Sequence, residues 1–403
     1  MIPGFFGLFS IILFIRFFDV ESYGQYSLLL SQCNLIVAFS FGWLNQSLLR
    51  YFSMDSSRAN FFNSQIRFLF FCIIISLIIL LFLIFVQSFS IAIWLVSCLA
   101  IISIGLFNYI KTVFQASLLP KSVMTFTTYQ SCLFILIPIA LSILLDKNPT
   151  TLLFGVALSF FIVSAIMVIN FSKIVSTSFS NNFNFGKMKL TFKKWFSYGA
   201  PISIWFAFGL ALPYLDRLFI NQYLNHSDLG MYASLQELLT KSFSITLFPI
   251  TMALHPRIMK LWNTSQYDDV IKLIKFGFSI MFFLGIAILL FVLKFDDIIY
   301  AVINWIIPQF SINSKSLLFP LLFSGFFWQL SFITHKMLEL KENTFLMILF
   351  IFPSLLINLI GNIIFLPQIG ELATAYSAFL SAFVYCIITT IYSIFSIIRI
   401  KRA

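Results

Sequence analysis

Apolar residues occur along this chain in long runs that short polar segments interrupt. Each run is roughly 17–25 residues long, which is the length that a helix needs to cross a hydrocarbon core about 30 Å thick. Because lipid offers the backbone no hydrogen-bond partner, runs of this kind must be helical. We expect twelve membrane-spanning helices, at residues 2–18, 25–46, 67–87, 89–110, 122–145, 151–170, 197–218, 229–254, 274–294, 316–335, 344–365 and 373–398.

The composition excludes most other classes of protein. Of the 403 residues, 60% are hydrophobic and only 10% are charged, so a soluble domain of this size could not cover its apolar side chains. A β-barrel would show short alternating segments, which are not visible. The five cysteines fall inside apolar runs without metal or disulfide spacing, so we expect no metal and no cofactor. The first run has no cleavage site, and we expect no cleavable signal peptide.

The cationic side chains predict the orientation. If both termini are cytoplasmic, 19 of the 25 Lys and Arg residues lie in inside segments, and only Lys147, Lys294 and Lys315 lie in outside loops. By the positive-inside rule, this distribution predicts a multi-pass protein of the bacterial inner membrane with both termini in the cytoplasm. The net charge of +11 follows from that asymmetry and from attraction to anionic membrane lipids, so no nucleic-acid partner is expected.

Two polar segments suggest how the spans are organised. Residues 171–196 are rich in Ser, Asn and Lys and predict a cytoplasmic linker between a six-helix half at 1–170 and a second at 197–403. We therefore expect an all-α polytopic membrane protein whose two halves surround a central cavity. The longest outside segment, 295–315, has isoleucines at near-helical spacing around Trp305 and is expected to lie in the outer interface.

A short pattern occurs once in each half. After span one the chain has Arg16, an acidic turn, and Gly24-x-Tyr26; after span seven it has Arg217, a longer acidic turn, and Gly230-x-Tyr232. We expect each glycine to form a tight turn at the outer face and each tyrosine to lie at the headgroup level. Transporters with two such repeats place their binding site between the halves.

Several segments resemble a known family. They are 17–26, 42–52 (GWLNQSLLRYF), Tyr198-Gly-Ala-Pro201, Asp216-Arg-Leu-Phe-Ile220, Leu229-Gly-Met-Tyr-Ala233 and Ala253-Leu-His-Pro-Arg257. With these segments the chain resembles the polysaccharide and O-antigen repeat-unit flippases (the Wzx type) of the multidrug/oligosaccharidyl-lipid/polysaccharide exporter superfamily. Such proteins usually carry basic residues before span one, and this chain does not, so its first span is expected to be clipped.

The resemblance implies a function and partners. It implies a flippase that moves an undecaprenyl-pyrophosphate-linked oligosaccharide, such as an O-antigen unit for lipopolysaccharide, to the periplasmic leaflet by alternating access. It also implies contact with the polysaccharide polymerase and chain-length machinery. The chain has no Gly-rich phosphate loop, nucleophile elbow or ATP-binding motif. We therefore expect no enzymatic activity and a cycle coupled to H⁺ or Na⁺.

Charged residues inside the spans are the candidate site. Such groups cost about 2.5–3.5 kcal/mol each at mid-helix on insertion scales, so function is the default explanation for them. Arg16, Arg217 and Lys241 are the candidates for binding a lipid pyrophosphate, because Arg and Lys hold phosphate well. Asp216 and Glu237 are the candidates for ion coupling. Asp216 points about 100° away from Arg217 on a helix, so the two need not pair.

Structural explanations of the same residues stay open. Arg16 and Arg217 lie near the outer ends of their spans, where an arginine can extend its charge to the interface. Glu237 and Lys241 are spaced i, i+4 and can simply neutralise each other. The three histidines at helix or loop ends, His226, His255 and His335, are expected to be solvated.

Two competing functions also remain. A multidrug exporter of the same superfamily is one, although cationic drugs favour an acidic cavity and the first six spans carry no mid-membrane carboxylate. A membrane glycosyltransferase or polymerase is the other, although the outside loops are too short for a catalytic domain.

Overall fold

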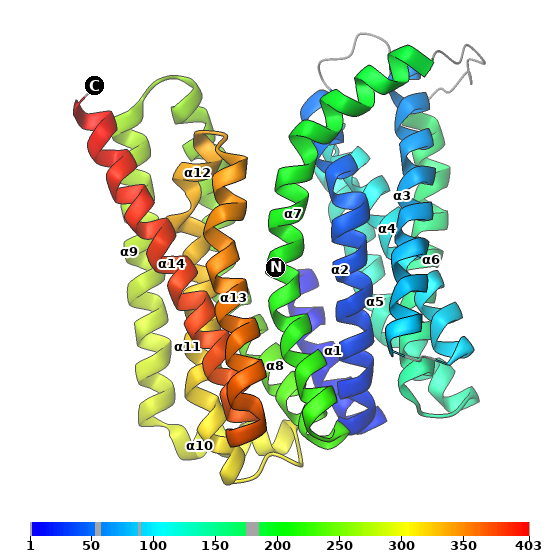
Figure 1. The fold of residues 1–403 in the computed structure, drawn as a ribbon, viewed down its shortest axis with the longest axis vertical. Helices are drawn as coiled ribbons and strands as arrows, with labels where there is room; N and C mark the ends of the chain where they lie inside the picture. The colour runs from blue at the N-terminus through cyan, green and yellow to red at the C-terminus, as the bar shows by residue number, and fades with distance from the viewer. Residues whose placement is uncertain (1, 53–57, 88–89, 175–184, 403) are drawn as a thin grey trace. The chain divides into compact units, whose positions relative to one another are not determined.

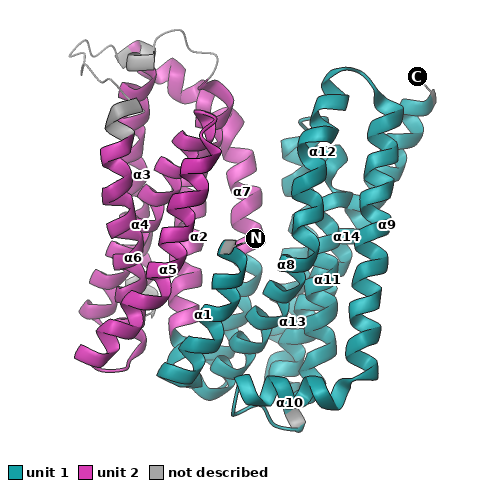
Figure 2. Ribbon diagram, turned by 180° about the vertical axis from the view of Figure 1, so that it is seen from behind, with its two compact units in different colours: residues 1–25, 211–403 teal, residues 26–210 magenta. Residues whose placement is uncertain are grey.

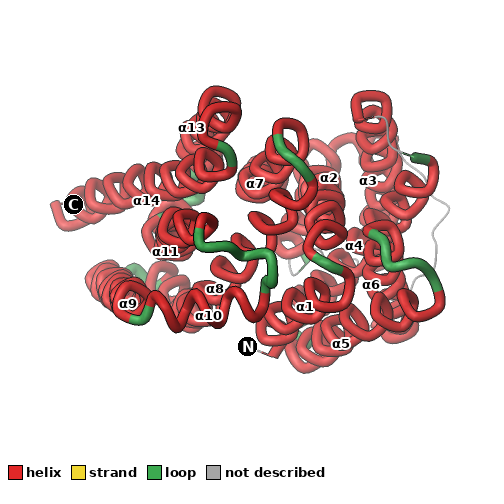
Figure 3. The backbone as a smooth tube through the Cα atoms, turned by 90° about the horizontal axis from the view of Figure 1, so that it is seen from below, coloured by secondary structure: helices red, strands yellow, loops and turns green. Residues whose placement is uncertain are grey.

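Helices account for nearly all of the residues that the structure describes. The computed structural model describes residues 2–52, 58–87, 90–174 and 185–402, and this part of the chain contains helices and loops but no strand (Figure 1, Figure 3). Each of the twelve predicted spans coincides with a long helix, because an apolar run inside lipid must satisfy its own backbone. These helices are α1 (Ile2–Phe18), α2 (Val20–Tyr51), α3 (Arg58–Gln87), α4 (Ile91–Ala116), α5 (Pro120–Leu144), α6 (Pro149–Ile174), α7 (Phe185–Tyr223), α8 (His226–Asn263), α9 (Tyr267–Lys294), α11 (Leu318–Thr334), α13 (Thr344–Ile369) and α14 (Glu371–Arg402).

The helices have the length and composition of membrane spans. Among the described residues, ten helices are long and apolar enough to cross a bilayer. The two remaining predicted spans are α1, which is apolar but has only 17 residues, and α8, which has 38 residues and carries Glu237 and Lys241. The predicted all-α polytopic membrane protein is confirmed.

Short helices fill the longest predicted outside segment and one inside connection. Residues 295–315 contain α10 (Asp296–Ile306) and the start of the 3₁₀ helix η1 (Asn313–Leu317), and α12 (Lys336–Leu340) follows α11. One face of α10 is buried, while Ile298, Val302 and Trp305 on another face are exposed. The Lys315 ammonium donates a hydrogen bond to Asp296 (2.6 Å) and thereby lowers the pKa of that carboxyl. The position of α10 in the outer interface stays a prediction.

The chain divides into two compact units (Figure 2). Unit 1 contains residues 1–25 and 211–403, and unit 2 contains residues 26–210, so the boundaries lie inside α2 and α7. In unit 1, α1 packs against α8 and α10, and α14 packs against α11 and α13; in unit 2, α6 packs against α4 and α5. The predicted halves 1–170 and 197–403 are a different division, which stays a prediction. Of the predicted linker 171–196, residues 175–184 lie outside the described residues.

The two glycines of the repeated pattern lie inside helices and not in turns. Gly24 belongs to α2 and Gly230 to α8, and within unit 1 their backbones touch. A Cβ atom built on Gly24 would lie 2.5 Å from the Cα atom of Gly230, and one built on Gly230 would overlap the carbonyl oxygen of Val20. The predicted glycine turns are therefore wrong. Both residues are needed for close helix approach, which glycine permits for the same reason that it permits turns, the missing Cβ.

The reversals themselves occur just before these helices. Asp19 has a φ of 80° between α1 and α2, and its carboxylate accepts a hydrogen bond from the Ser22 amide (2.7 Å). Asn225 caps α8 in the same way by accepting a hydrogen bond from the Asp228 amide (2.8 Å). Short polar side chains at these positions satisfy the amide groups that a helix start leaves free.

Candidate functional site

Arg217 and Glu237 form an ion pair inside unit 1. Arg217 lies on α7 and Glu237 on α8, and their Nη2 and Oε1 atoms are 2.9 Å apart. The hydroxyl of Tyr23 donates to the other carboxylate oxygen of Glu237 (2.8 Å). Lys241, one helical turn further along α8, has its Nζ 3.8 Å from the same oxygen. We call these four residues the basic cluster, since its two cations face one carboxylate.

The two cations of the basic cluster differ in exposure. The Arg217 side chain is 7% exposed, while that of Lys241 is 38% exposed. Lys241 also donates a hydrogen bond to the backbone carbonyl of Gly7 on α1 (3.1 Å). Arg217 is thus enclosed and held by Glu237, whereas Lys241 is partly exposed and only loosely paired. The expected i, i+4 pair between Glu237 and Lys241 exists, but the shorter contact of Glu237 is to Arg217.

Asp216 lies in a second group of polar side chains and is almost completely buried. Its carboxylate accepts hydrogen bonds from the side-chain amides of Asn358 (2.7 Å) and Asn362 (3.3 Å) on α13. On α8, the Gln236 amide (2.8 Å) and the Tyr232 hydroxyl (3.1 Å) donate to the other oxygen. We call these five residues the Asp216 cluster. Its donors are all uncharged, so the carboxylate is solvated by dipoles and not by a cation.

The helical geometry of α7 explains why neighbouring charges enter different clusters. Successive side chains on a helix project about 100° apart. Asp216 therefore reaches α13, while Arg217 reaches Glu237, and the two neighbours do not need to pair with each other, as expected from the sequence. Tyr232 was expected at the headgroup level, but it is fully buried against Asp216, and Tyr26 is buried too. Both tyrosines are therefore buried within the protein, and their position at the headgroup level stays a prediction.

Asn358 and Asn362 are site residues that the sequence interpretation missed. They are spaced i, i+4 on α13, which is mostly apolar, so both side chains project from the same face. The hydroxyl of Thr374, near the start of α14, donates to the carboxamide oxygen of Asn362 (2.7 Å). Two amides on one face of an apolar span are a signal that could have identified them, because lipid-facing amides are costly.

Arg16 is the third predicted substrate-binding cation. No contact that the structure describes joins it to Arg217 or Lys241. Its side chain is exposed, and its guanidinium carbon lies 5.0 Å from the centroid of the Trp305 ring on α10. An arginine stacked on tryptophan is a cation–π contact that suits the membrane interface. This placement agrees with the structural explanation of Arg16, and its role in substrate binding stays a prediction.

The histidines are only partly solvated. His226 is exposed, and the side chain of His255 is 42% exposed, but His335 is buried. The Nε2 atom of His335 lies 2.6 Å from the Glu339 carboxylate, which also accepts a hydrogen bond from Lys336 (2.6 Å). The expectation for His335 is wrong because the break between α11 and α12 turns its ring inward. Among the described residues, no three His, Cys, Asp or Glu side chains meet as a metal site.

The buried ion pair gives a stability prediction. We expect Arg217→Leu to lower the free energy of unfolding by about 3 kcal/mol, because a buried charge that loses its partner is left uncompensated. The double variant Arg217→Leu/Glu237→Gln should recover much of this loss. Thermal unfolding of the detergent-solubilised protein would measure both, with Arg16→Leu as an exposed-cation control. Equal melting temperatures for Arg217→Leu and Arg16→Leu would contradict the pairing.

Comparisons with known proteins identify the fold. A family model described as "Polysaccharide biosynthesis protein" matches residues 4–262, which is more than half of the chain. The lipid II flippase MurJ in an inward closed conformation is similar in structure, with a TM-score of 0.72 at 14% identity over 99% of this chain and 88% of that one. An inward-facing multidrug resistance MATE family transporter of the MOP superfamily gives 0.69 at 11% identity over 100% and 96%. Among curated proteins, none matches.

These similarities test the predicted fold and the predicted family. The predicted helical fold and the resemblance to the exporter superfamily are confirmed. At such low identity the solved structures show the fold alone. The family match shows that the chain belongs to the polysaccharide biosynthesis proteins, and the fold is one that a lipid flippase and a multidrug transporter also have.

Proposed function

Because the chain belongs to the family of polysaccharide biosynthesis proteins, we propose that it is a flippase for a lipid-linked oligosaccharide. Its substrate would be an undecaprenyl-pyrophosphate-linked unit, such as an O-antigen repeat, carried from the cytoplasmic to the periplasmic leaflet of the bacterial inner membrane. Both termini would be cytoplasmic. The basic cluster is the observation that carries this proposal, since it combines a net positive charge with a partly exposed lysine inside a membrane-spanning unit.

The chemistry of the basic cluster suits a pyrophosphate. Lys241 is a cation with three donors, of which one contacts Gly7 and another faces Glu237 only at 3.8 Å. A phosphate oxygen can therefore replace Glu237 as the acceptor for this N–H group of Lys241 at little cost. Arg217 and Tyr23 hold Glu237 in place, so that the carboxylate does not follow the lysine. Arg217 thus positions the cluster, and Lys241 is the residue proposed to contact substrate.

We propose that the Asp216 cluster binds the coupling ion. A carboxylate with carboxamide and hydroxyl oxygens nearby offers the hard donors that Na⁺ accepts, and the carboxylate alone can take H⁺. The side-chain amides that now donate to Asp216 would present oxygen instead of nitrogen after a half-turn about their terminal torsion. Glu237 is the second candidate, but it already has Arg217, Tyr23 and Lys241 around it. The Asp216 carboxylate has no such cation among its hydrogen-bond partners.

Transport by lysine variants tests the substrate site. In proteoliposomes with a fluorescent undecaprenyl-pyrophosphate oligosaccharide, Lys241→Gln should lower the initial flipping rate about tenfold, the factor for one lost charge-assisted contact of roughly 1.4 kcal/mol. Lys241→Arg should retain most of the rate, because it keeps the charge.

The same experiment separates the alternatives. Flipping at the normal rate by Lys241→Gln would show that the lysine is not part of the substrate site. Efflux of a cationic dye such as ethidium, together with no flipping of the lipid-linked oligosaccharide, would replace the flippase proposal by that of a multidrug exporter.

A further inference from the structure

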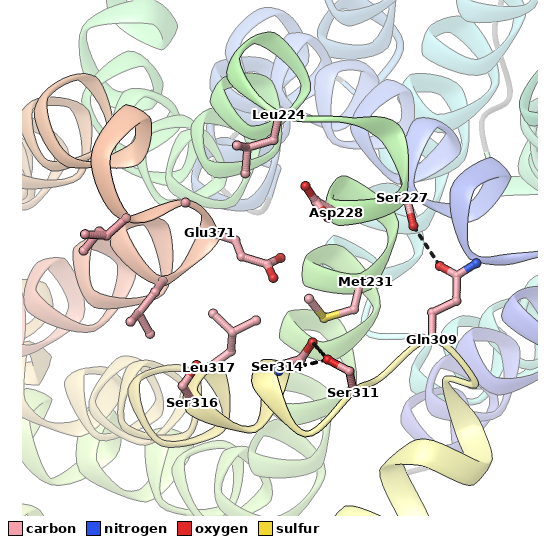
Figure 4. A pocket seen from close by; sticks show the side chains of 13 residues that line it. Leu224, Ser227, Asp228, Met231, Gln309, Ser311, Ser314, Ser316, Leu317 and Glu371 are labelled. Carbon is pink, nitrogen blue, oxygen red and sulfur yellow. Dashed lines mark hydrogen bonds between the residues drawn. The ribbon is translucent and has the colours of Figure 1, made fainter.

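Unit 1 has a cavity at the end where its helices α7 and α8 are joined (Figure 4). The cavity has a volume of about 490 Å³ and lies among the turn between α7 and α8, the segment between α10 and α11, and the start of α14. In the predicted orientation this is the periplasmic end of the unit. None of the functions proposed above uses it.

The lining of the cavity is acidic. Asp228 from α8 and Glu371 from α14 contribute two carboxylates, and of the described residues that line the cavity none is cationic. Figure 4 shows the Glu371 side chain extending into the space, with Asp228 at the wall contributed by α8. Serine hydroxyls and the Gln309 amide supply most of the remaining polar groups. Two carboxylates without a cation repel each other, so the cavity attracts a positive charge.

Helix capping does not account for both carboxylates. Each lies in the first turn of its helix, where a negative charge is favourable. However, the cap of α8 is already supplied by Asn225, which accepts a hydrogen bond from the Asp228 amide. In Glu371, the Oε2 atom is buried and has no hydrogen-bond partner among the described residues. A buried carboxylate oxygen without a donor is costly unless the group takes up a proton or a cation approaches it.

Asp228 lies one helical turn from a member of the Asp216 cluster, and Glu371 lies one turn from a residue that contacts a member. On α8, Asp228 is four residues before Tyr232 and so projects from the same face. On α14, Glu371 is three residues before Thr374, which contacts Asn362. Tyr232 and Asn362 both donate to Asp216. Since a helical turn rises about 5.4 Å, two helices connect the lining of the cavity with the surroundings of Asp216 over a short distance.

We propose that this cavity is an outer vestibule that collects the coupling cation and passes it to Asp216. The inference rests on the proposed ion coupling at that residue. The vestibule would bind a small monovalent cation through carboxylate and hydroxyl oxygens, which replace part of its hydration shell before it enters the apolar interior. Its negative charge repels a pyrophosphate, so ion and substrate would enter unit 1 by different routes.

Na⁺ binding by the purified full-length protein tests the vestibule. Binding of ²²Na⁺ would be measured in detergent against choline chloride, with affinity and association rate determined separately. We expect Asp228→Asn/Glu371→Gln to weaken apparent Na⁺ affinity and slow association about tenfold, the lower end of the range for electrostatic focusing. The same amount of Na⁺ should still bind at saturation. Asp297→Asn is the matched control, since Asp297 is exposed near the same end of unit 1 and does not line the cavity.

The outcomes distinguish the vestibule from the coupling site. Glu371→Asp keeps the charge and should bind Na⁺ as the unaltered protein does. This variant therefore distinguishes an effect of lost charge from an effect of misfolding. Unchanged affinity and rate in the double variant would overturn the vestibule and leave Asp216 as the site. Unchanged binding in Asp216→Asn would overturn the coupling site itself. If the unaltered protein binds no Na⁺, the vestibule is overturned and Asp216 remains a candidate for protons only.

Discussion

Replacement of Asp216 by asparagine should abolish ion-coupled transport while leaving the protein folded. Asparagine has nearly the same shape as aspartate, but it removes the single negative charge of the Asp216 cluster. Charged hydrogen bonds are worth up to about 3 kcal/mol, which corresponds to roughly a 100-fold loss of cation affinity. Stability should change little, because burial of an ionised carboxylate is itself unfavourable and the variant avoids it.

Gradient-driven flipping measures this effect. Proteoliposomes would be given a Na⁺ gradient at equal pH, or a pH gradient at equal Na⁺, and the initial flipping rate would be recorded for each. In the unaltered protein one gradient should accelerate flipping, and in Asp216→Asn neither should. Asp296→Asn, a carboxylate on α10 paired with Lys315, serves as the control. Acceleration that persists in Asp216→Asn would show that the coupling ion binds elsewhere, with Glu237 as the next candidate.

Gly230→Ala should prevent unit 1 from assembling correctly. The new methyl group would overlap both the carbonyl oxygen and the carbonyl carbon of Val20. Both obstacles are backbone atoms, which cannot rotate away as a flexible side chain would. Overpacking of this kind costs about 3 kcal/mol, and here it separates α8 from α2 at the contact that brings Tyr23 to Glu237.

Size-exclusion chromatography of a fluorescent fusion would show the loss. We expect Gly230→Ala to give aggregated or rapidly melting protein, and Gly24→Ala to behave similarly. Gly7→Ala on α1 is the matched control, because its methyl group would meet only Lys241 side-chain atoms, at 3.7 Å or more. A monodisperse Gly230→Ala variant with unchanged melting temperature would mean that the two helices separate at little cost.

The sequence predicted helices better than it predicted contacts. Apolar runs determine where helices lie in a membrane, so all twelve spans were found and the helical part of 295–315 was anticipated. The glycines were misinterpreted because one property, the missing Cβ, suits both a turn and a close helix contact. Only the position of Gly24 opposite Gly230 distinguishes the two, and that depends on residues far apart in the chain.

The candidate site was likewise predicted in part. Charges inside apolar spans identified Asp216, Arg217, Glu237 and Lys241, which the structure gathers in unit 1. The local spacing predicted the Glu237–Lys241 pair, but it could not predict the shorter Arg217–Glu237 contact, which requires α7 and α8 to lie side by side. Asn358 and Asn362 carry no charge and were passed over. Their importance follows from the buried carboxylate that they face.

The membership of α1 in unit 1 has a consequence for synthesis of the protein. Tyr23 emerges 214 residues before its partner Glu237. At about 5–20 residues per second, α1 waits roughly 10–40 s in the bilayer before α8 is made. Unit 2 is one continuous stretch of chain and can complete its packing during that interval. Unit 1 closes only when the last helices have been inserted, so a chain truncated after α7 would leave its first helix without α8 and α10, against which it packs, and open to degradation.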